Sequence, residues 1–116
     1  LTNQCQKSRS NGIEILGCHT VLIAGNTCEH IGGSDLKHPW AGIRVTAERF
    51  GEDGRSSDVS IFDNAVTHSL HGIYLDTVDR VTVGRNAISD TLNKPLLRLG
   101  SGVSEVSVSD ERLKAP

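Results

Sequence analysis

One pattern returns along the chain, and this repeat constrains the fold more than any other feature of the sequence. Each copy has a Gly-Ile segment in which apolar residues alternate with polar ones, then a short segment that begins with Val, and then an Asn. The three full copies comprise residues 12–15, 21–23 and Asn26; residues 42–45, 59–61 and Asn64; and residues 72–75, 81–83 and Asn86. A degenerate fourth copy covers residues 97–99 and 106–108, and a partial copy opens with Asn3 and Cys5.

The spacing of the Asn residues separates the repeat from its insertions. Asn64 and Asn86 are 22 residues apart, whereas Asn26 and Asn64 are 38 apart, an excess of 16 residues. Half of this excess precedes residues 43–45, at about residues 30–41, and half follows them, at about residues 46–58. The apolar segments keep their lengths, so they are expected to be the scaffold and the insertions to be surface loops.

Alternation of apolar and polar residues is the period of a β-strand. One copy alone cannot bury its apolar side, but stacked copies can, and β-branched residues suit the buried face of parallel strands. The expected inward columns are Ile13, Ile43, Ile73 and Leu97; Ile15, Val45, Leu75 and Leu99; Val21, Val59, Val81 and Val106; Ile23, Ile61, Val83 and Val108; and Cys5, Cys28, Val66 and Ile88. The sequence therefore predicts an all-β fold, a parallel solenoid of about four coils of ~22 residues.

The pattern G-I-x-[IVL], V-x-[IV]-x-x-N-x-[IVC] resembles the repeat of the pectate-lyase-like superfamily of right-handed single-stranded parallel β-helices. The resemblance covers nearly the whole chain. It implies that the Gly-Ile strands form a first sheet, the strands before Asn a second, and the strands after Asn a third. The Asn residues would form a column in the turn between the second and third sheets, passing amide hydrogen bonds from coil to coil.

Length and composition limit the remaining possibilities. With 116 residues the chain is one domain at most, and its net charge of -2 gives no basic footprint for nucleic acid and no polybasic patch for a membrane. No apolar run approaches the roughly 20 residues that span a bilayer. The three Cys residues are too few and of odd number for a disulfide framework, and their spacing does not indicate zinc.

The start of the sequence enters the repeat at its second strand, without a polar cap. Residues 1–116 are therefore expected to be a single β-helix segment, the C-terminal part of a longer solenoid. Its expected partners are N-terminal coils of the same protein, or a second copy of the chain through exposed strand edges. The resemblance implies an extracellular, periplasmic or surface-associated location.

Both insertions flank the strand at residues 43–45, so the first sheet is where a groove is expected. The outward positions of this sheet are Glu14, Arg44, Tyr74 and Arg98, and the preceding loop adds His38 and Trp40. An Arg suits a carboxylate or sulfate, and aromatic rings suit the apolar face of a sugar. We expect catalysis from Arg44, Tyr74, His68 and His71, and substrate binding by Trp40, His38, Glu14 and Arg98. The alternative is that these are ordinary solvated residues.

A second polar column follows each Asn by four residues and contains Lys7, His30, His68 and Asp90. His68 with Asp90 and the nearby His71 could act as a general base with an orienting carboxylate, or take part in a metal site; a polar turn column without a function explains the spacing equally. No metal site is assigned from the residues, and the cofactor stays unknown. Calcium enters only through the resemblance, as a possible neutraliser of a uronate carboxylate.

The resemblance implies a carbohydrate-active protein that acts on an acidic polysaccharide, with its groove around residues 40–76. A lyase or epimerase is favoured over a hydrolase, because the first sheet lacks the cluster of Asp residues typical of polygalacturonases. It also lacks two outward carboxylates at the 5–9 Å separation that glycosidases use. The alternative is a non-catalytic β-helix segment, such as a carbohydrate-binding stalk, an adhesin or a tailspike scaffold.

Overall fold

The computed structural model describes residues 4–6, 12–31, 41–47, 54–92 and 96–109, with only the backbone for residues 4–6, 30, 31 and 98. These ranges hold twelve β-strands and no α-helix. The strands are β1 (Gln4–Gln6), β2 (Ile13–Leu16), β3 (His19–Ala24), β4 (Thr27–Ile31), β5 (Ala41–Thr46), β6 (Ser56–Phe62), β7 (Ala65–Ser69), β8 (His71–Leu75), β9 (Val78–Val83), β10 (Ala87–Ser89), β11 (Leu97–Leu99) and β12 (Val103–Val108).

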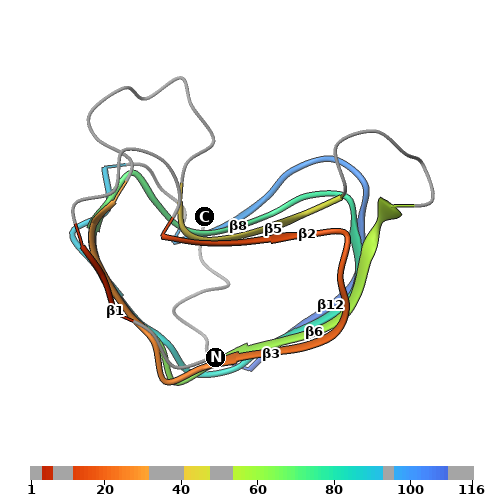
Figure 1. The fold of residues 1–116 in the computed structure, drawn as a ribbon, viewed down its shortest axis with the longest axis horizontal. Helices are drawn as coiled ribbons and strands as arrows, with labels where there is room; N and C mark the ends of the chain where they lie inside the picture. Colours follow the sequence, from red (N-terminus) through yellow and green to blue (C-terminus); the bar gives the residue numbers. More distant parts are fainter. Residues whose placement is uncertain (1–3, 7–11, 32–40, 48–53, 93–95, 110–116) are drawn as a thin grey trace.

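The strands form three parallel sheets of four strands each. The first sheet has the order β2-β5-β8-β11, the second β3-β6-β9-β12, and the third β1-β4-β7-β10. Consecutive strands enter the three sheets in turn, so every third strand returns to the same sheet beside its predecessor. Figure 1 looks along this stack and shows the strands of each sheet lying one behind another on three sides of the molecule.

The register of the sheets confirms the alignment predicted from the repeat. Ile13 pairs with Ile43, Ile43 with Ile73, and Ile73 with Leu97. The column that begins with Ile15 is aligned in the same way in the first sheet, and the other three columns are aligned so in the second and third sheets. A slip by one residue would turn each apolar set outward, so the buried face determines this register.

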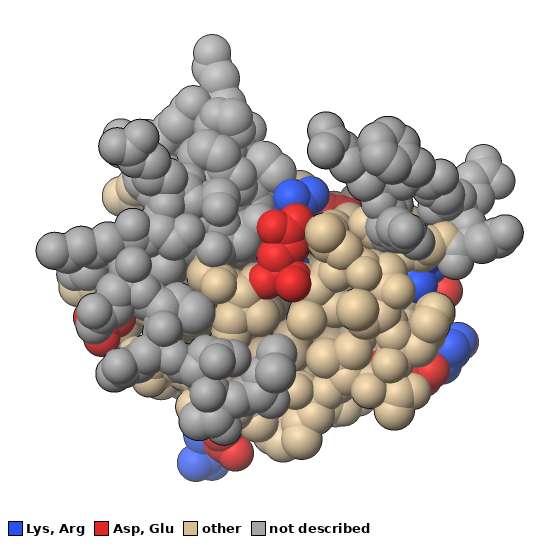
Figure 2. Space-filling view, in the orientation of Figure 1, with Lys and Arg blue, Asp and Glu red and all other residues tan. Residues whose placement is uncertain are grey.

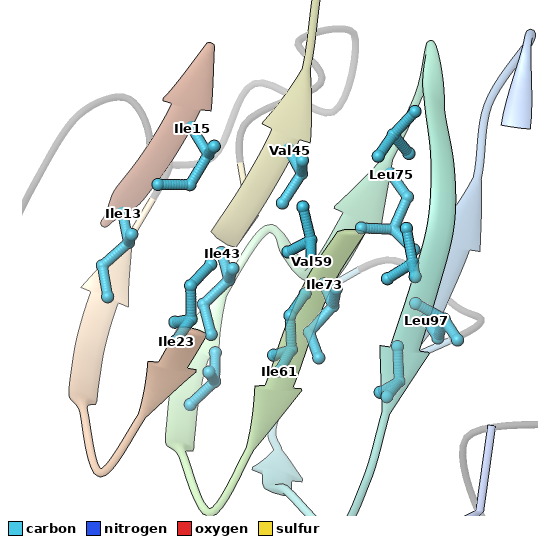
Figure 3. Packing of buried hydrophobic residues seen from close by; sticks show 14 of the residues in the cluster. Ile13, Ile15, Ile23, Ile43, Val45, Val59, Ile61, Ile73, Leu75 and Leu97 are labelled. Carbon is cyan, nitrogen blue, oxygen red and sulfur yellow. The ribbon is translucent and has the colours of Figure 1, made fainter. Parts of the chain in front are cut away.

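The inward columns pack against one another as one hydrophobic core (Figure 3). Side chains from all three sheets are fully buried there, among them Ile43, Ile61 and Val66. Leu99 differs from the prediction, because it is aligned with Leu75 but is 52% exposed. The reason is its place in β11, the last strand of the first sheet, where no described strand covers it.

The predicted Asn column is present and buried. The side-chain Nδ2 of Asn26 donates to Oδ1 of Asn64 at 2.9 Å, and the backbone N–H of Asn26 donates to the same oxygen at 3.0 Å. Asn64 repeats both hydrogen bonds to Asn86, at 2.9 and 3.0 Å. Nδ2 of Asn64 also donates to the backbone carbonyl of Ile23. These bonds satisfy polar groups that water does not reach.

Packing explains why each copy of the repeat has a Gly before its Ile. A Cβ at Gly42 would meet the side chain of Val66, and one at Gly72 would lie 2.7 Å from Cγ2 of Ile88 and 2.5 Å from a backbone oxygen. The inward column of the third sheet therefore packs directly against the start of the first-sheet strands. Only a residue without a side chain leaves room for it.

Candidate functional site

The outer face of the first sheet carries the residues predicted to bind a ligand. Glu14 is aligned with Arg44, Arg44 with Tyr74, and Tyr74 with Arg98, so these four positions form one column across adjacent strands. The side chain of Glu14 is exposed, and those of Arg44 and Tyr74 are half-buried. Figure 2 shows the end of the stack formed by β2 and β3, where a few acidic and basic side chains lie on a largely uncharged surface.

Three of the four predicted catalytic residues lie together on β5 and β8. The guanidinium carbon of Arg44 lies 5.7 Å from the centre of the Tyr74 ring, within the range of a cation–π contact. The ring of His71 meets the Tyr74 ring edge-on, with 5.3 Å between centroids and an angle of 88° between planes. His71 is buried, so the Tyr74 ring rests against a side chain that solvent does not reach.

Asp76 and Thr46 complete this cluster. Nη2 of Arg44 forms an ion pair with Oδ2 of Asp76 at 3.2 Å, and the Thr46 hydroxyl donates to Oδ1 of Asp76. Nε of Arg44 is buried and has no hydrogen-bond partner among the described residues. Asp76 therefore holds the guanidinium by one nitrogen only, which leaves the two-nitrogen fork that grips carboxylates incompletely used. We call Arg44, Thr46, Tyr74 and Asp76 the first-sheet cluster.

His68 is placed in a different sheet from the other three predicted catalytic residues. It is part of β7, and its Nε2 lies 3.8 Å from Oδ2 of Asp90, with both side chains more than half exposed. The predicted stacking of His68 and Asp90 is thus confirmed as a contact. The side chain of His30 is not described.

Several predicted positions lie outside the described residues. Trp40, His38 and Lys7 belong to undescribed segments, as do most of the two insertions. Arg98 is described only by its backbone, in β11 beside Tyr74. Their proposed part in binding stays a prediction.

The sequence reasoning missed a polar cluster at the start of the second-sheet strands. Nη2 of Arg55 lies 2.7 Å from Oδ1 of Asp79, Nε of Arg55 lies 3.0 Å from Oδ2, and the Ser104 hydroxyl donates to Oδ1 at 2.5 Å. The hydrogen bonds from Arg55 first, and from Ser104 second, hold the pKa of Asp79 well below its ordinary value. This cluster joins β9 and β12 to the residue directly before β6.

A second missed ion pair lies beside the first. Nε and Nη2 of Arg80 donate to the two carboxylate oxygens of Asp58, at 2.8 and 3.1 Å. The hydrogen bond to Arg80 is the main reason that the pKa of Asp58 is lowered. The two residues are 22 positions apart, so aligning opposite charges at the repeat length would have found them. We call Arg55–Asp79 and Asp58–Arg80 the second-sheet ion pairs.

The described residues offer no evident metal centre. Within the ranges that the structure describes, no group of three or more His, Cys, Asp or Glu residues is placed to hold a metal ion. Cys28 is buried in the core, as its column predicted, and Cys18 is exposed. Calcium, which the resemblance allows, has no such group of ligands among the described residues.

Comparison with protein-family models, with curated proteins and with solved structures found no match to this chain. Among the described residues, none of the elements is a helix that is long and apolar enough to cross a membrane.

Proposed function

We propose that the three parallel sheets are the faces of a right-handed parallel β-helix of the pectate-lyase-like type. Three observations support this: the 22-residue spacing, the strict rotation of consecutive strands through three sheets, and the hydrogen-bonded Asn column between the second and third sheets. In such a coil the interior is filled by side chains, so a function belongs to an outer face.

We further propose that this β-helix acts on an acidic polysaccharide at the outer face of its first sheet. The observation that carries the proposal is the placement of the Arg44 guanidinium against the half-buried Tyr74 ring. A uronate ring would stack on Tyr74, while its carboxylate would compete with Asp76 for the guanidinium of Arg44. Glu14 and Arg98, in the same column, would flank the sugar chain on either side.

The reaction that suits these groups is β-elimination or epimerisation. Both begin when a base removes the proton on the carbon next to the uronate carboxylate, and a cation beside the carboxylate stabilises the charge that develops. Arg44 would supply that cation. Tyr74 would act in its deprotonated form: its phenolate oxygen would take the proton from the carbon, and the hydroxyl so formed would give a proton to the glycosidic oxygen in elimination, or to the carbon in epimerisation. In elimination the bond to the glycosidic oxygen then breaks, that oxygen gains a proton, and a carbon–carbon double bond forms.

His71 and His68 would have different parts in this proposal. His71 lies under the edge of the Tyr74 ring and is buried, so it would position the ring and its hydroxyl. His68 is exposed beside Asp90 on the third sheet, where it could serve a substrate chain that extends past the first sheet. Trp40 and His38, from the insertion before β5, would add to the binding surface.

A second candidate is a non-catalytic scaffold or carbohydrate-binding segment of a stalk, adhesin or tailspike. It is supported by the ion pairs that outward-facing charged residues form with one another. The ion pair Arg80–Asp58 joins neighbouring strands of one sheet, and each of the pairs Arg44–Asp76 and Arg55–Asp79 joins a strand to the residue next to the end of the neighbouring strand. Charges arranged in this way could stabilise a long stack without any chemistry.

The test is incubation of the protein with polygalacturonate, alginate and hyaluronate, following the ultraviolet absorbance of an unsaturated product and, by NMR, any inversion at the uronate carbon. We expect product from one of these polymers and its loss in Arg44→Ala. Tyr74→Phe should lower the rate about 100-fold, the usual scale of proton-transfer catalysis, with little change in KM. Arg80→Ala is the matched control, because it removes an exposed, paired Arg from another sheet.

The result separates the two candidates. Binding of a uronate polymer that Arg44→Ala abolishes, without any product, supports the non-catalytic segment. Product formation that survives Arg44→Ala in a folded variant would remove the first-sheet cluster from the site.

A further inference from the structure

The outer face of the second sheet contains a polar groove that the proposed function does not use. Its volume is about 370 Å³, which falls in the range of small-molecule sites. The groove is lined by Asp58, Val59, Ser60, Arg80, Thr82, Glu105 and Ser107, from the adjacent strands β6, β9 and β12. We call it the second-sheet groove.

One side of this groove is a row of hydroxyl groups. Ser60 is aligned with Thr82, and Thr82 with Ser107, so one hydroxyl side chain stands on each successive strand. Each alternates with inward residues, and Thr82 and Ser107 are exposed. Neighbouring strands lie about 4.8 Å apart, so the row presents a donor and acceptor at each such step, close to the length of one sugar ring.

The other side is a row of charged groups whose backbone has an unusual conformation. Asp58, Arg80 and Glu105 have φ angles of 55°, 56° and 55°. Non-glycine residues rarely adopt this left-handed conformation, and it recurs at the same position of all four strands of this sheet, since Thr20 in β3 has a φ of 56°. The recurrence stacks the three side chains beside the hydroxyl row, so the groove has two parallel polar walls.

The charges of this wall indicate which ligand it suits. The guanidinium of Arg80 donates hydrogen bonds to both carboxylate oxygens of Asp58. Glu105 adds a further negative charge on the next strand. The groove thus holds two carboxylates and one paired cation. Carboxylates accept hydrogen bonds and repel anions, so a ligand with many hydroxyl donors and no negative charge fits best.

An aromatic ring borders the hydroxyl row. Phe62 follows Ser60 by two residues and therefore points to the same outer side of β6. Gly84, next to it on the chain segment after β9, leaves space for Phe62, since a Cβ at Gly84 would lie 2.9 Å from the Phe62 Cβ. Phe62 is half-buried, and the exposed part of its ring could receive the apolar face of a sugar.

From these observations we infer that the second-sheet groove binds a neutral, polyhydroxylated saccharide chain that runs across β6, β9 and β12. The hydroxyl row and the carboxylates of Asp58 and Glu105 bind the sugar hydroxyls, and Phe62 stacks against a ring at one end. This site lies on a different sheet from the first-sheet cluster and does not depend on the proposed function. A chain bearing both sites would hold a neutral and an acidic glycan at once.

The test is isothermal titration of the whole chain with cellohexaose, maltohexaose and mannohexaose, and separately with hexagalacturonate. We expect one of the neutral sugars to bind, and the triple variant Ser60→Ala, Thr82→Val, Ser107→Ala to weaken this binding about tenfold or more, since the variant removes three side-chain hydroxyls that bind the sugar. Ser89→Ala, an exposed hydroxyl on the third sheet, should leave the affinity unchanged. Far-UV circular dichroism checks that the triple variant is folded.

Two results would overturn the inference: no binding of any of the three neutral sugars, or equal affinity of the triple variant and the unaltered chain. Arg44→Ala keeps this test independent of the proposed function. It should abolish the binding of hexagalacturonate and leave the binding of the neutral sugar as it was. Chemical-shift changes confined to residues of β6, β9 and β12 would locate the sugar directly.

Discussion

The Asn column and the second-sheet ion pairs both join side chains in neighbouring strands of the stack, yet they lie in opposite environments. Asn26, Asn64 and Asn86 are at most 2% exposed, whereas the side chains of Arg80 and Asp58 are 53% and 48% exposed. A buried hydrogen bond cannot be replaced by one to water when it is broken, but an exposed ion pair can. The uncharged column should therefore contribute far more to stability than the charged pair.

The largest effect is expected from Asn64→Ala. The Asn64 side chain accepts two hydrogen bonds from Asn26 and donates to Asn86 and to the carbonyl of Ile23, so its removal leaves several buried groups without partners. We expect the free energy of unfolding to fall by about 3 kcal/mol or more, measured by urea denaturation. Asp63→Asn is the control, because Asp63 is exposed and Asn tolerates its left-handed φ of 60°. A loss below about 1 kcal/mol in Asn64→Ala would contradict the comparison.

A somewhat smaller effect is expected from Gly42→Ala, which tests the packing between the third and first sheets. The added Cβ would meet the Val66 side chain, and overpacking of a close-packed core costs about 1–3 kcal/mol. In a chain that already carries Val66→Ala, the same substitution should cost less than half as much, because the obstructing methyl groups are gone. A double-mutant cycle in urea measures this coupling. Equal costs in both backgrounds would show that Val66 is not the obstacle.

The repeat that contains Asn64 and Gly42 also shows what can be predicted from the sequence. The recurrence of Ile43, Val66 and Asn64 at fixed spacing is enough to predict the register, since a one-residue slip would expose every apolar column. The partners of Arg44 and Arg80 were not predicted, because an outward position can hold any polar residue and its contacts depend on side-chain direction. Asp76, one residue past its strand, has no periodic signal at all. The contacts of the candidate site are therefore harder to predict from the sequence than the fold.

Arg44→Met should have an intermediate effect on stability. The side chains of Arg44 and Asp76 are 21% and 17% exposed, between the values of the Asn column and of Arg80–Asp58. Removing the guanidinium leaves the Asp76 carboxylate half-buried with Thr46 as a hydrogen-bond donor, so we expect a loss of about 1 kcal/mol. Combining it with Asp76→Asn should recover part of this loss, because the unpaired charge is gone. A loss as large as that of Asn64→Ala would mean that this pair behaves as a buried one.

The smallest effect is expected from the second-sheet ion pairs, and it depends on pH. The pKa values of Asp79 and Asp58 are lowered by hydrogen bonds from Arg55 and Arg80, respectively. A carboxylate with a lowered pKa in the folded state adds stability above its unfolded pKa of about 3.9, and that contribution is lost as the pH falls towards the folded value. The double variant Asp58→Asn, Asp79→Asn should therefore differ from the unaltered chain only slightly at pH 7. Thermal denaturation from pH 5 to pH 2 should show a shallower loss of stability in the variant, and the pH 7 difference should shrink further in 1 M salt, which screens exposed charges. Equal slopes at acid pH, or a difference at pH 7 comparable to that of Asn64→Ala, would show that exposure does not separate the two kinds of contact.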